Sequence, residues 1–222
     1  MFKIHWKERI LEILILMAGL IIAHFGVTLF LLAELGTDPF NVFVQGIFRT
    51  LNHLTGWSFL THGRVHMVLC FLIIVLLLRI DRSYIRIGTI FCMIFGGPII
   101  DMFTALLSPL FSGEMSLFLR ILVNAAGCVI LAYGMTIVIK SEAGTGPNDL
   151  VAIVLADKLK KRFSIVRILA DVCFAGTGFL LGGTLGLGTV ICAGLVGPTA
   201  GLFLPINGKM ISAIKKNILK SS

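Results

Sequence analysis

Six long apolar segments constrain this chain more than any other feature of its sequence. They lie at about 10–35, 57–78, 87–110, 117–139, 164–181 and 187–205. A run of about 20 apolar residues is long enough to cross a bilayer as a helix. The mean hydropathy is +1.01, and only 14% of the residues are charged. The sequence therefore predicts one all-α transmembrane domain over residues 1–222, with six spans and no separate soluble domain.

The positions of Lys and Arg predict how the six spans are oriented. With the N-terminus in the cytoplasm, the cytoplasmic segments hold 16 of the 19 Lys and Arg residues, and the outer segments hold only Arg49, Arg64 and Arg120. Cytoplasmic loops of membrane proteins carry such an excess. We therefore expect both termini in the cytoplasm, with a basic tail at 207–222. The net charge of +8 then reflects the bilayer as partner and not nucleic acid.

A Gly-Thr-x-Pro break occurs twice and reveals an internal duplication. Shifting the chain by 108 residues aligns 13–39 with 121–147, and 11 of these 27 positions are identical, including three glycines, two threonines and a proline. A shift of 100 aligns 88–92 with 188–192. The repeats are expected at about 10–110 and 117–206. Because each repeat has three spans, the second must be inverted relative to the first, as in many transporters.

Each break interrupts an apolar run and is followed by polar side chains. Gly permits unusual backbone dihedrals and Pro lacks a donor, so short helices are expected at about 38–54 and 148–162. A membrane tolerates such breaks only where protein or a water-filled cavity satisfies the freed backbone. The hypothesis is a solute site where the repeats meet, and the alternative is simple helix capping. The residues expected to line the site are Thr37, Asp38, Asn41, Gln45, Thr145, Asn148 and Asp149.

Ionisable side chains inside the apolar segments are further candidates, because they are costly in a membrane. Arg64 and Arg167 align at a shift of 103 and are expected to attract or gate an anion. Asp101, Asp171 and His24 are candidates for proton coupling. Three alternatives stay open: Asp101 is wetted at the outer interface, Asp171 only neutralises Arg167 one turn earlier, and His24 is a hydrogen-bonded packing residue.

Other polar residues carry weaker signals. His62 and His66 flank Arg64, where an anion-binding vestibule and snorkelling at the interface fit equally well. All five cysteines fall in apolar segments, and no Cys/His spacing indicates a metal. No nucleophile–base pair and no phosphate-binding loop is recognisable. We therefore expect neither an enzyme nor a bound metal or cofactor.

Three motifs make the chain resemble a known family. They are G-T-D-P-F-N at 36–41, A-G-T-G-P-N-D-L at 143–150 and L-G-L-G-T at 185–189. The chain is similar in these motifs to the YczE/YyaS/YitT-like family of small bacterial integral membrane proteins. The resemblance implies a multi-pass protein of the bacterial plasma membrane and assigns no site residue.

The expected function is that of a small transporter or facilitator for a small polar or anionic solute, with H⁺ or Na⁺ as a coupling ion. Two alternatives are an aquaporin-like channel, which also uses inverted three-span repeats, and a non-transporting accessory or regulatory membrane protein. Small-residue faces would also allow a homodimer.

Overall fold

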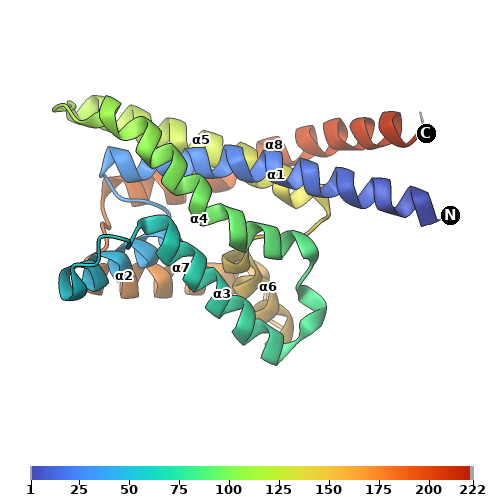
Figure 1. Ribbon diagram of the computed structural model, residues 1–222, viewed down its shortest axis with the longest axis horizontal. Helices are drawn as coiled ribbons and strands as arrows, with labels where there is room; N and C mark the ends of the chain where they lie inside the picture. The colour runs from blue at the N-terminus through green and yellow to red at the C-terminus, as the bar shows by residue number, and fades with distance from the viewer. Residues whose placement is uncertain (1, 221–222) are drawn as a thin grey trace.

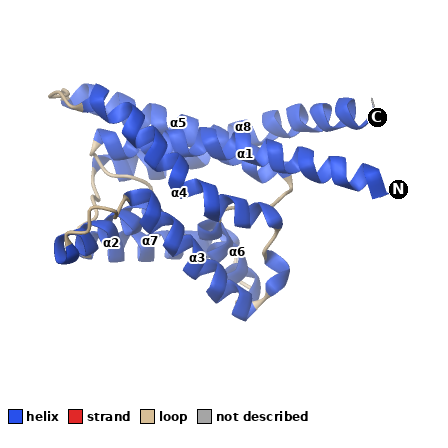
Figure 2. Cartoon of the chain, viewed as in Figure 1, coloured by secondary structure: helices blue, strands red, loops and turns tan. Residues whose placement is uncertain are grey.

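The computed structural model describes residues 2–220, so the last two residues of the predicted basic tail lie outside it. Within this range it consists of helices and loops, with no strand (Figure 2). The elements in chain order are α1 (Phe2–Ala33), α2 (Pro39–Thr55), α3 (His62–Ile80), η1 (Arg82–Tyr84), α4 (Ile87–Leu107), η2 (Ser108–Phe111), α5 (Leu117–Ser141), α6 (Pro147–Lys158), α7 (Phe163–Leu180) and α8 (Leu187–Lys220).

The predicted segments correspond closely to these helices. The six apolar runs are α1, α3, α4, α5, α7 and α8, and the two short helices that follow the breaks are α2 and α6. Among the described residues, five helices are long and apolar enough to cross a membrane: α1, α3, α4, α5 and α8. The 18-residue α7 is not among them. One difference concerns the tail, because 207–220 continues α8 as helix and does not form a separate segment.

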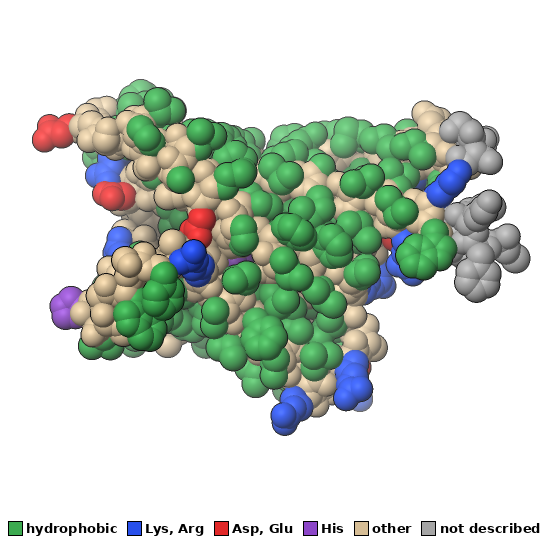
Figure 3. All heavy atoms as spheres, in the orientation of Figure 1, with side chains coloured by type: hydrophobic (Ala, Val, Ile, Leu, Met, Phe, Trp, Pro, Cys, Tyr) green, Lys and Arg blue, Asp and Glu red, His purple; other side chains and the backbone are tan. Residues whose placement is uncertain are grey.

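The surface fits a bilayer environment. Many large apolar side chains are exposed on the long helices, among them Leu76, Leu106, Val190 and Leu202. Figure 3 shows apolar side chains across the middle of the visible face and charged ones toward its ends. A water-soluble protein would have to cover such an area. The all-helical, membrane-embedded class is therefore confirmed.

Helices α1 and α5 form the centre of the fold and lie side by side along much of their length (Figure 1). Matched glycines allow the close approach. A Cβ added to Gly26 would lie 2.6 Å from the backbone nitrogen of Leu131 and 2.7 Å from the carbonyl oxygen of Gly127, and one on Gly19 would lie 2.9 Å from the carbonyl oxygen of Gly134. The contacts are Gly26 with Gly127 and Gly19 with Gly134. The 108-residue shift aligns Gly19 with Gly127 and Gly26 with Gly134, so it converts one contact into the other.

The two breaks adopt matching backbone conformations. After α1, Glu34 and Gly36 have φ values of 52° and 107°, and after α5 the aligned Glu142 and Gly144 have φ values of 67° and 150°. This left-handed region favours glycine, so both shared glycines are required by the turn. Each break then leads through its Pro into the first turn of a short helix, where Pro is well tolerated.

Each break is held by the opposite half of the chain. The amide of Gly188, at the start of α8, donates to the carbonyl oxygen of Leu35 at 2.7 Å. The amide of Gly88, at the start of α4, donates to the carbonyl oxygen of Ala143 at 3.0 Å. Since 35 aligns with 143 and 88 with 188, the two bonds are equivalent under the repeat. The two hydrogen bonds thus join positions that correspond under the 108- and 100-residue shifts of the sequence.

The close crossing of α1 and α5 makes its glycines sensitive to substitution. We expect Gly26→Ala to lower the unfolding free energy of the purified protein by about 1–3 kcal/mol, because the added methyl group would overlap the α5 backbone. Gly194→Ala in α8 is the matched control, since a Cβ there meets no atom within 4 Å. Thermal unfolding in detergent would measure both. Equal effects of the two variants would contradict the crossing.

Candidate functional site

The first turn of α2 presents a carboxylate and an amide that bind each other. Asp38 is the N-cap of α2, and its Oδ1 accepts from the backbone amide of Asn41 at 3.3 Å. The side-chain amide of Asn41 donates to Oδ2 of Asp38 at 2.7 Å. Asn41 is 4% exposed. Asp38 therefore both caps α2 and supplies the carboxylate at its start.

Helices α6 and α7 contribute an arginine between two carboxylates. Nη1 of Arg167 donates to Oδ1 of Asp149 at 2.6 Å, and its Nε donates to Oδ2 of Asp171 at 3.1 Å. Asp149 lies in the first turn of α6, and Asp171 follows Arg167 by one turn of α7. The three side chains are between 23% and 32% exposed, so the guanidinium is partly enclosed and already paired.

Asp38 lies close enough to Arg167 and Asp171 for their charges to interact. The structure thus brings together residues from α2, α6 and α7, which we call the central cluster: Asp38, Asn41, Asp149, Arg167 and Asp171. Asp149 and Asp171 pair with the Arg167 guanidinium, and Asp38 lies within the range of its charge. In the repeat, Asp149 aligns with Asn41 and Gly146 with Asp38, so the two halves place their carboxylates at different positions of the first turn.

A line of polar side chains continues from the cluster into α3. Nε2 of His62 donates to Oδ1 of Asn41 at 3.1 Å, and Asn41 in turn donates to Asp38. One turn later, His66 is 6% exposed and packs edge-on against His24 with 5.6 Å between ring centroids. His24 donates from Nδ1 to the carbonyl oxygen of Leu20 at 2.9 Å. His24 is therefore hydrogen-bonded inside the packed interior, beside a second imidazole.

Of the other residues predicted to line the site, some lie next to members of the central cluster, and Gln45 instead binds the loop before α8. The hydroxyl of Thr37 donates to the carbonyl oxygen of Asp38 at 3.2 Å, and the Asn148 amide lies 3.4 Å from Asp149. The Thr145 hydroxyl is buried without a hydrogen bond. Gln45 accepts from the backbone amide of Thr184 at 2.7 Å, so it fixes the loop before α8.

Arg64 does not join Arg167, although the two align in sequence. It is exposed near the start of α3, and its guanidinium donates to the carbonyl oxygen of Phe59. The sequence match placed both residues near the start of a span but could not indicate their side-chain directions. A site with two convergent arginines is therefore not what the chain forms.

Asp101 of α4 links α4 to the start of α3 through hydrogen bonds to its carboxylate. Its Oδ2 accepts from the hydroxyl of Thr61 at 2.5 Å and its Oδ1 from the backbone amide of Gly63 at 2.9 Å. Gly63 and Gly97 meet so closely at this crossing that a Cβ on either would overlap the other's backbone. Asp101 satisfies the free amide of Gly63 at a helix start, which is a cap supplied by a neighbouring helix. Its carboxylate is occupied by this contact.

The equivalent crossing is open in the second half of the chain. Gly97 and Asp101 align with Gly197 and Gly201, and a Cβ added to either of these glycines meets nothing within 4 Å. Helix α7 packs chiefly on α2 and α6, whereas α8 packs on α5 and α1. Two halves that share a backbone pattern thus differ in one contact: α3 is closed on α4, and α7 is separated from α8.

Asn124 is a buried polar residue that the sequence reasoning missed. It is fully buried in α5, and its amide donates to the carbonyl oxygen of Gly36 at 3.1 Å, while its Oδ1 has no partner. In the repeat it aligns with Leu16. The sequence signal for this residue was the alignment of a polar Asn with an apolar Leu. Because Asn124 binds the first break, the surroundings of that break are more polar than those of the second.

The described residues contain no group of three or more His, Cys, Asp or Glu side chains that could hold a metal ion. The cluster is instead an arrangement of fixed charges and hydrogen-bond donors. It can bind a polar group or exchange a proton at a carboxylate.

Fold and cluster together define an all-helical membrane protein with charged residues in its interior. Comparison with known proteins names the family. Residues 10–205 match the model of the Family of unknown function (DUF6198), and the chain belongs to that family. The resemblance seen in the sequence motifs is thereby confirmed.

Three relatives cover most of the chain. An "Uncharacterized protein" of Haemophilus influenzae is 27% identical over 92% of this chain and 88% of its own. The "Uncharacterized membrane protein YczE" of Bacillus subtilis is 28% identical over 90% and 88%, and the "Uncharacterized protein YyaS" of the same species is 23% identical over 85% and 90%. No solved structure matches the chain.

The ion pairs of Arg167 can be tested by a double-mutant cycle. Arg167→Gln leaves Asp149 and Asp171 without their cation, so we expect the unfolding free energy to fall by about 2 kcal/mol, less than for fully buried pairs because these groups are partly exposed. Adding Asp149→Asn to that variant should recover part of the loss. Thermal unfolding measures the cycle, with exposed Arg162→Gln as control. Strictly additive effects would contradict the pairing.

Proposed function

We propose that this protein is a small secondary transporter or facilitator of a small polar solute, with the central cluster as its site. The observation that carries the proposal is the partly enclosed Arg167, paired with Asp149 and Asp171 and close to Asp38. Charges in membrane-embedded helices are costly and are typical of substrate and ion pathways. Their position after two helix breaks matches the site architecture of inverted-repeat transporters.

The charges of the cluster favour a polar or cationic group over an anion. Arg167 already has two carboxylate partners, and Arg64 lies apart from it. Asp38 is held by Asn41 but has no cationic hydrogen-bond partner among the described residues. We therefore propose Asp38 as the carboxylate that takes up the coupling ion, H⁺ or Na⁺. The hydrogen bond from His62 to Asn41 is proposed to orient the Asn41 amide and, through it, the Asp38 carboxylate.

The unequal crossings support a transporter over an aquaporin-like channel. In an inverted repeat, α3–α4 and α7–α8 are equivalent contacts at opposite faces of the membrane. A closed α3–α4 contact with an open α7–α8 contact is what alternating access requires, with one side closed at a time. With the orientation given by the Lys and Arg distribution, the open side is cytoplasmic. A channel would need both sides open together.

The interior also argues against a purely accessory role. A scaffold gains nothing from the Thr145 hydroxyl and the Asn124 Oδ1, two buried polar atoms that lack protein partners. Such atoms are expensive unless water or a ligand reaches them. A dry, fully paired interior would have favoured the accessory alternative.

Loss of either break carboxylate should impair solute movement. A ligand found by a thermal-shift screen, in which binding to the folded state raises its stability, would be followed as flux into proteoliposomes. We expect Asp38→Asn and Asp149→Asn each to reduce the flux at least about tenfold, since each removes a charge worth more than about 1.4 kcal/mol of binding. Exposed Glu114→Gln is the control. Wild-type flux in both site variants would reject the site.

The contact made by Asp101 should control which side is closed. Asp101→Asn is expected to increase deuterium uptake at the start of α3, because it weakens the bonds to Thr61 and Gly63. If the two crossings alternate, uptake at the start of α7 should fall at the same time as α7 closes on α8. Hydrogen exchange followed by mass spectrometry measures both segments. Increased uptake in both would indicate general destabilisation and would argue against alternation.

A further inference from the structure

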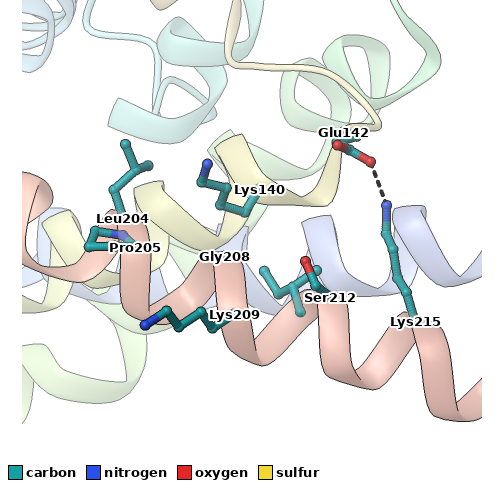
Figure 4. A pocket seen from close by; sticks show the side chains of 9 residues that line it. Lys140, Glu142, Leu204, Pro205, Gly208, Lys209, Ser212 and Lys215 are labelled. Atoms are coloured by element: carbon teal, nitrogen blue, oxygen red, sulfur yellow. Dashed lines mark hydrogen bonds and ion pairs between the residues drawn. The ribbon is translucent and has the colours of Figure 1, made fainter.

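A second polar site lies away from the central cluster, between the end of α5 and the C-terminal part of α8. It is a surface groove of about 540 Å³. Figure 4 shows Lys140 on α5 beside the turn of α8 that holds Pro205 and Gly208, with Lys209 directly after Gly208 and Ser212 one turn later. One part of the groove wall is therefore basic, with Lys140 and Lys209, and another part is apolar, with Leu204 and Pro205.

The three lysines of this groove differ in whether they form salt bridges. Lys215 is paired, since its Nζ lies 2.8 Å from Oε2 of Glu142 and 3.2 Å from Oε1 of Glu12. Among the described residues, by contrast, Lys140 and Lys209 have no hydrogen-bond or ion-pair partner. An open pocket with two unpaired ammonium groups is suited to an anion with several oxygens, such as a phosphate.

The local structure keeps Lys140 in place. A Cβ added to Gly208 would lie 3.3 Å from Cε and 3.6 Å from Cδ of Lys140, so the lysine stem lies directly over this glycine. The repeat does not require this arrangement. Lys140 aligns with Leu32, and α8 has 34 residues where its counterpart α4 has 21. The groove is thus an addition to the duplicated fold.

An apolar surface leads directly to the basic end of the groove. Leu202 and Ile206 are 62% and 53% exposed, and they precede Lys209 by seven and three residues, on one face of α8. An acyl chain could lie along this face while its headgroup reaches the lysines. A free phosphate would make no use of it.

We propose that this groove binds the phosphate of an anionic phospholipid, with Lys140 and Lys209 as its ligands and the acyl chains along α8. By the Lys and Arg distribution, the lipid belongs to the cytoplasmic leaflet, where basic pockets between helices bind such headgroups. The site is independent of the central cluster, so its test does not depend on transport.

Native mass spectrometry of the purified protein would test the proposal with phosphatidylglycerol, with phosphatidylcholine of the same acyl chains and with inorganic phosphate. We expect tight binding of phosphatidylglycerol alone. Each lysine removed should weaken it about fivefold, so Lys140→Gln with Lys209→Gln should weaken it about 25-fold. The matched control replaces two exposed lysines of the α6–α7 loop, Lys160→Gln with Lys161→Gln, and should bind as the wild type does.

Three results would overturn the proposal. Phosphatidylcholine binding equally well would mean that acyl chains alone decide, and inorganic phosphate binding equally well would indicate a soluble anion. Unchanged binding by the groove double variant would place the lipid elsewhere. If that double variant does not fold, Lys209→Gln alone serves, because Lys209 is exposed and unpaired, and it must still lose about fivefold.

Discussion

A broken helix inside a membrane leaves backbone carbonyl groups that only the protein can satisfy, and here each half of the chain satisfies the other. The carbonyl oxygens of Leu35 and Ala143 accept from the first turns of α8 and α4. These helices lie in the opposite halves of the sequence, so an isolated half would leave its break without this partner. The α1–α5 crossing, with its matched glycines, holds the halves in the register that this exchange requires.

The same arrangement explains why the charged residues can be tolerated. Both breaks end in a Pro that starts a short helix, and the first turns of α2 and α6 carry Asp38 and Asp149. Arg167 then compensates the charge of Asp149. What differs between the halves is the closing contact: Asp101 joins α4 to α3, whereas Gly201 leaves α8 free of α7. The backbone pattern is shared, and the side chains make it asymmetric.

Much of the fold could be predicted from the sequence because the signals were strong and local. Apolar length located the helices, and the repeat located both breaks. Residue type and spacing also gave the Arg167–Asp171 pair, one helical turn apart. The role of Asp101 could not be predicted, because it depends on which helix crosses α4 at Gly97. The direction of the Arg64 side chain could not be predicted for a similar reason, since alignment gives a position on a helix but not the direction of a side chain. The sequence predicted 207–220 only as a basic tail after the last span, because its many polar residues end the apolar run that marks a membrane helix.

Two features depend on tertiary contacts that no sequence pattern indicates. The bond between His62 and Asn41 joins residues of different helices, and the sequence offers no periodicity that pairs them. The buried Asn124 was visible only as a polar residue opposite Leu16 in the repeat. Both lie at contacts between repeats or between neighbouring helices, where tertiary packing and not local pattern decides the neighbours.

The claim that the central cluster opens to one side at a time is tested most directly by chemical accessibility. In a chain with Cys173→Ala, the Asp171→Cys variant would be treated with a membrane-impermeant thiol reagent from each side of oriented vesicles. The account predicts labelling from the side that carries the lysine-rich helix ends and none from the other. Labelling from both sides under the same conditions would indicate a pore, and labelling from neither would indicate a closed, dry interior; either result would contradict it.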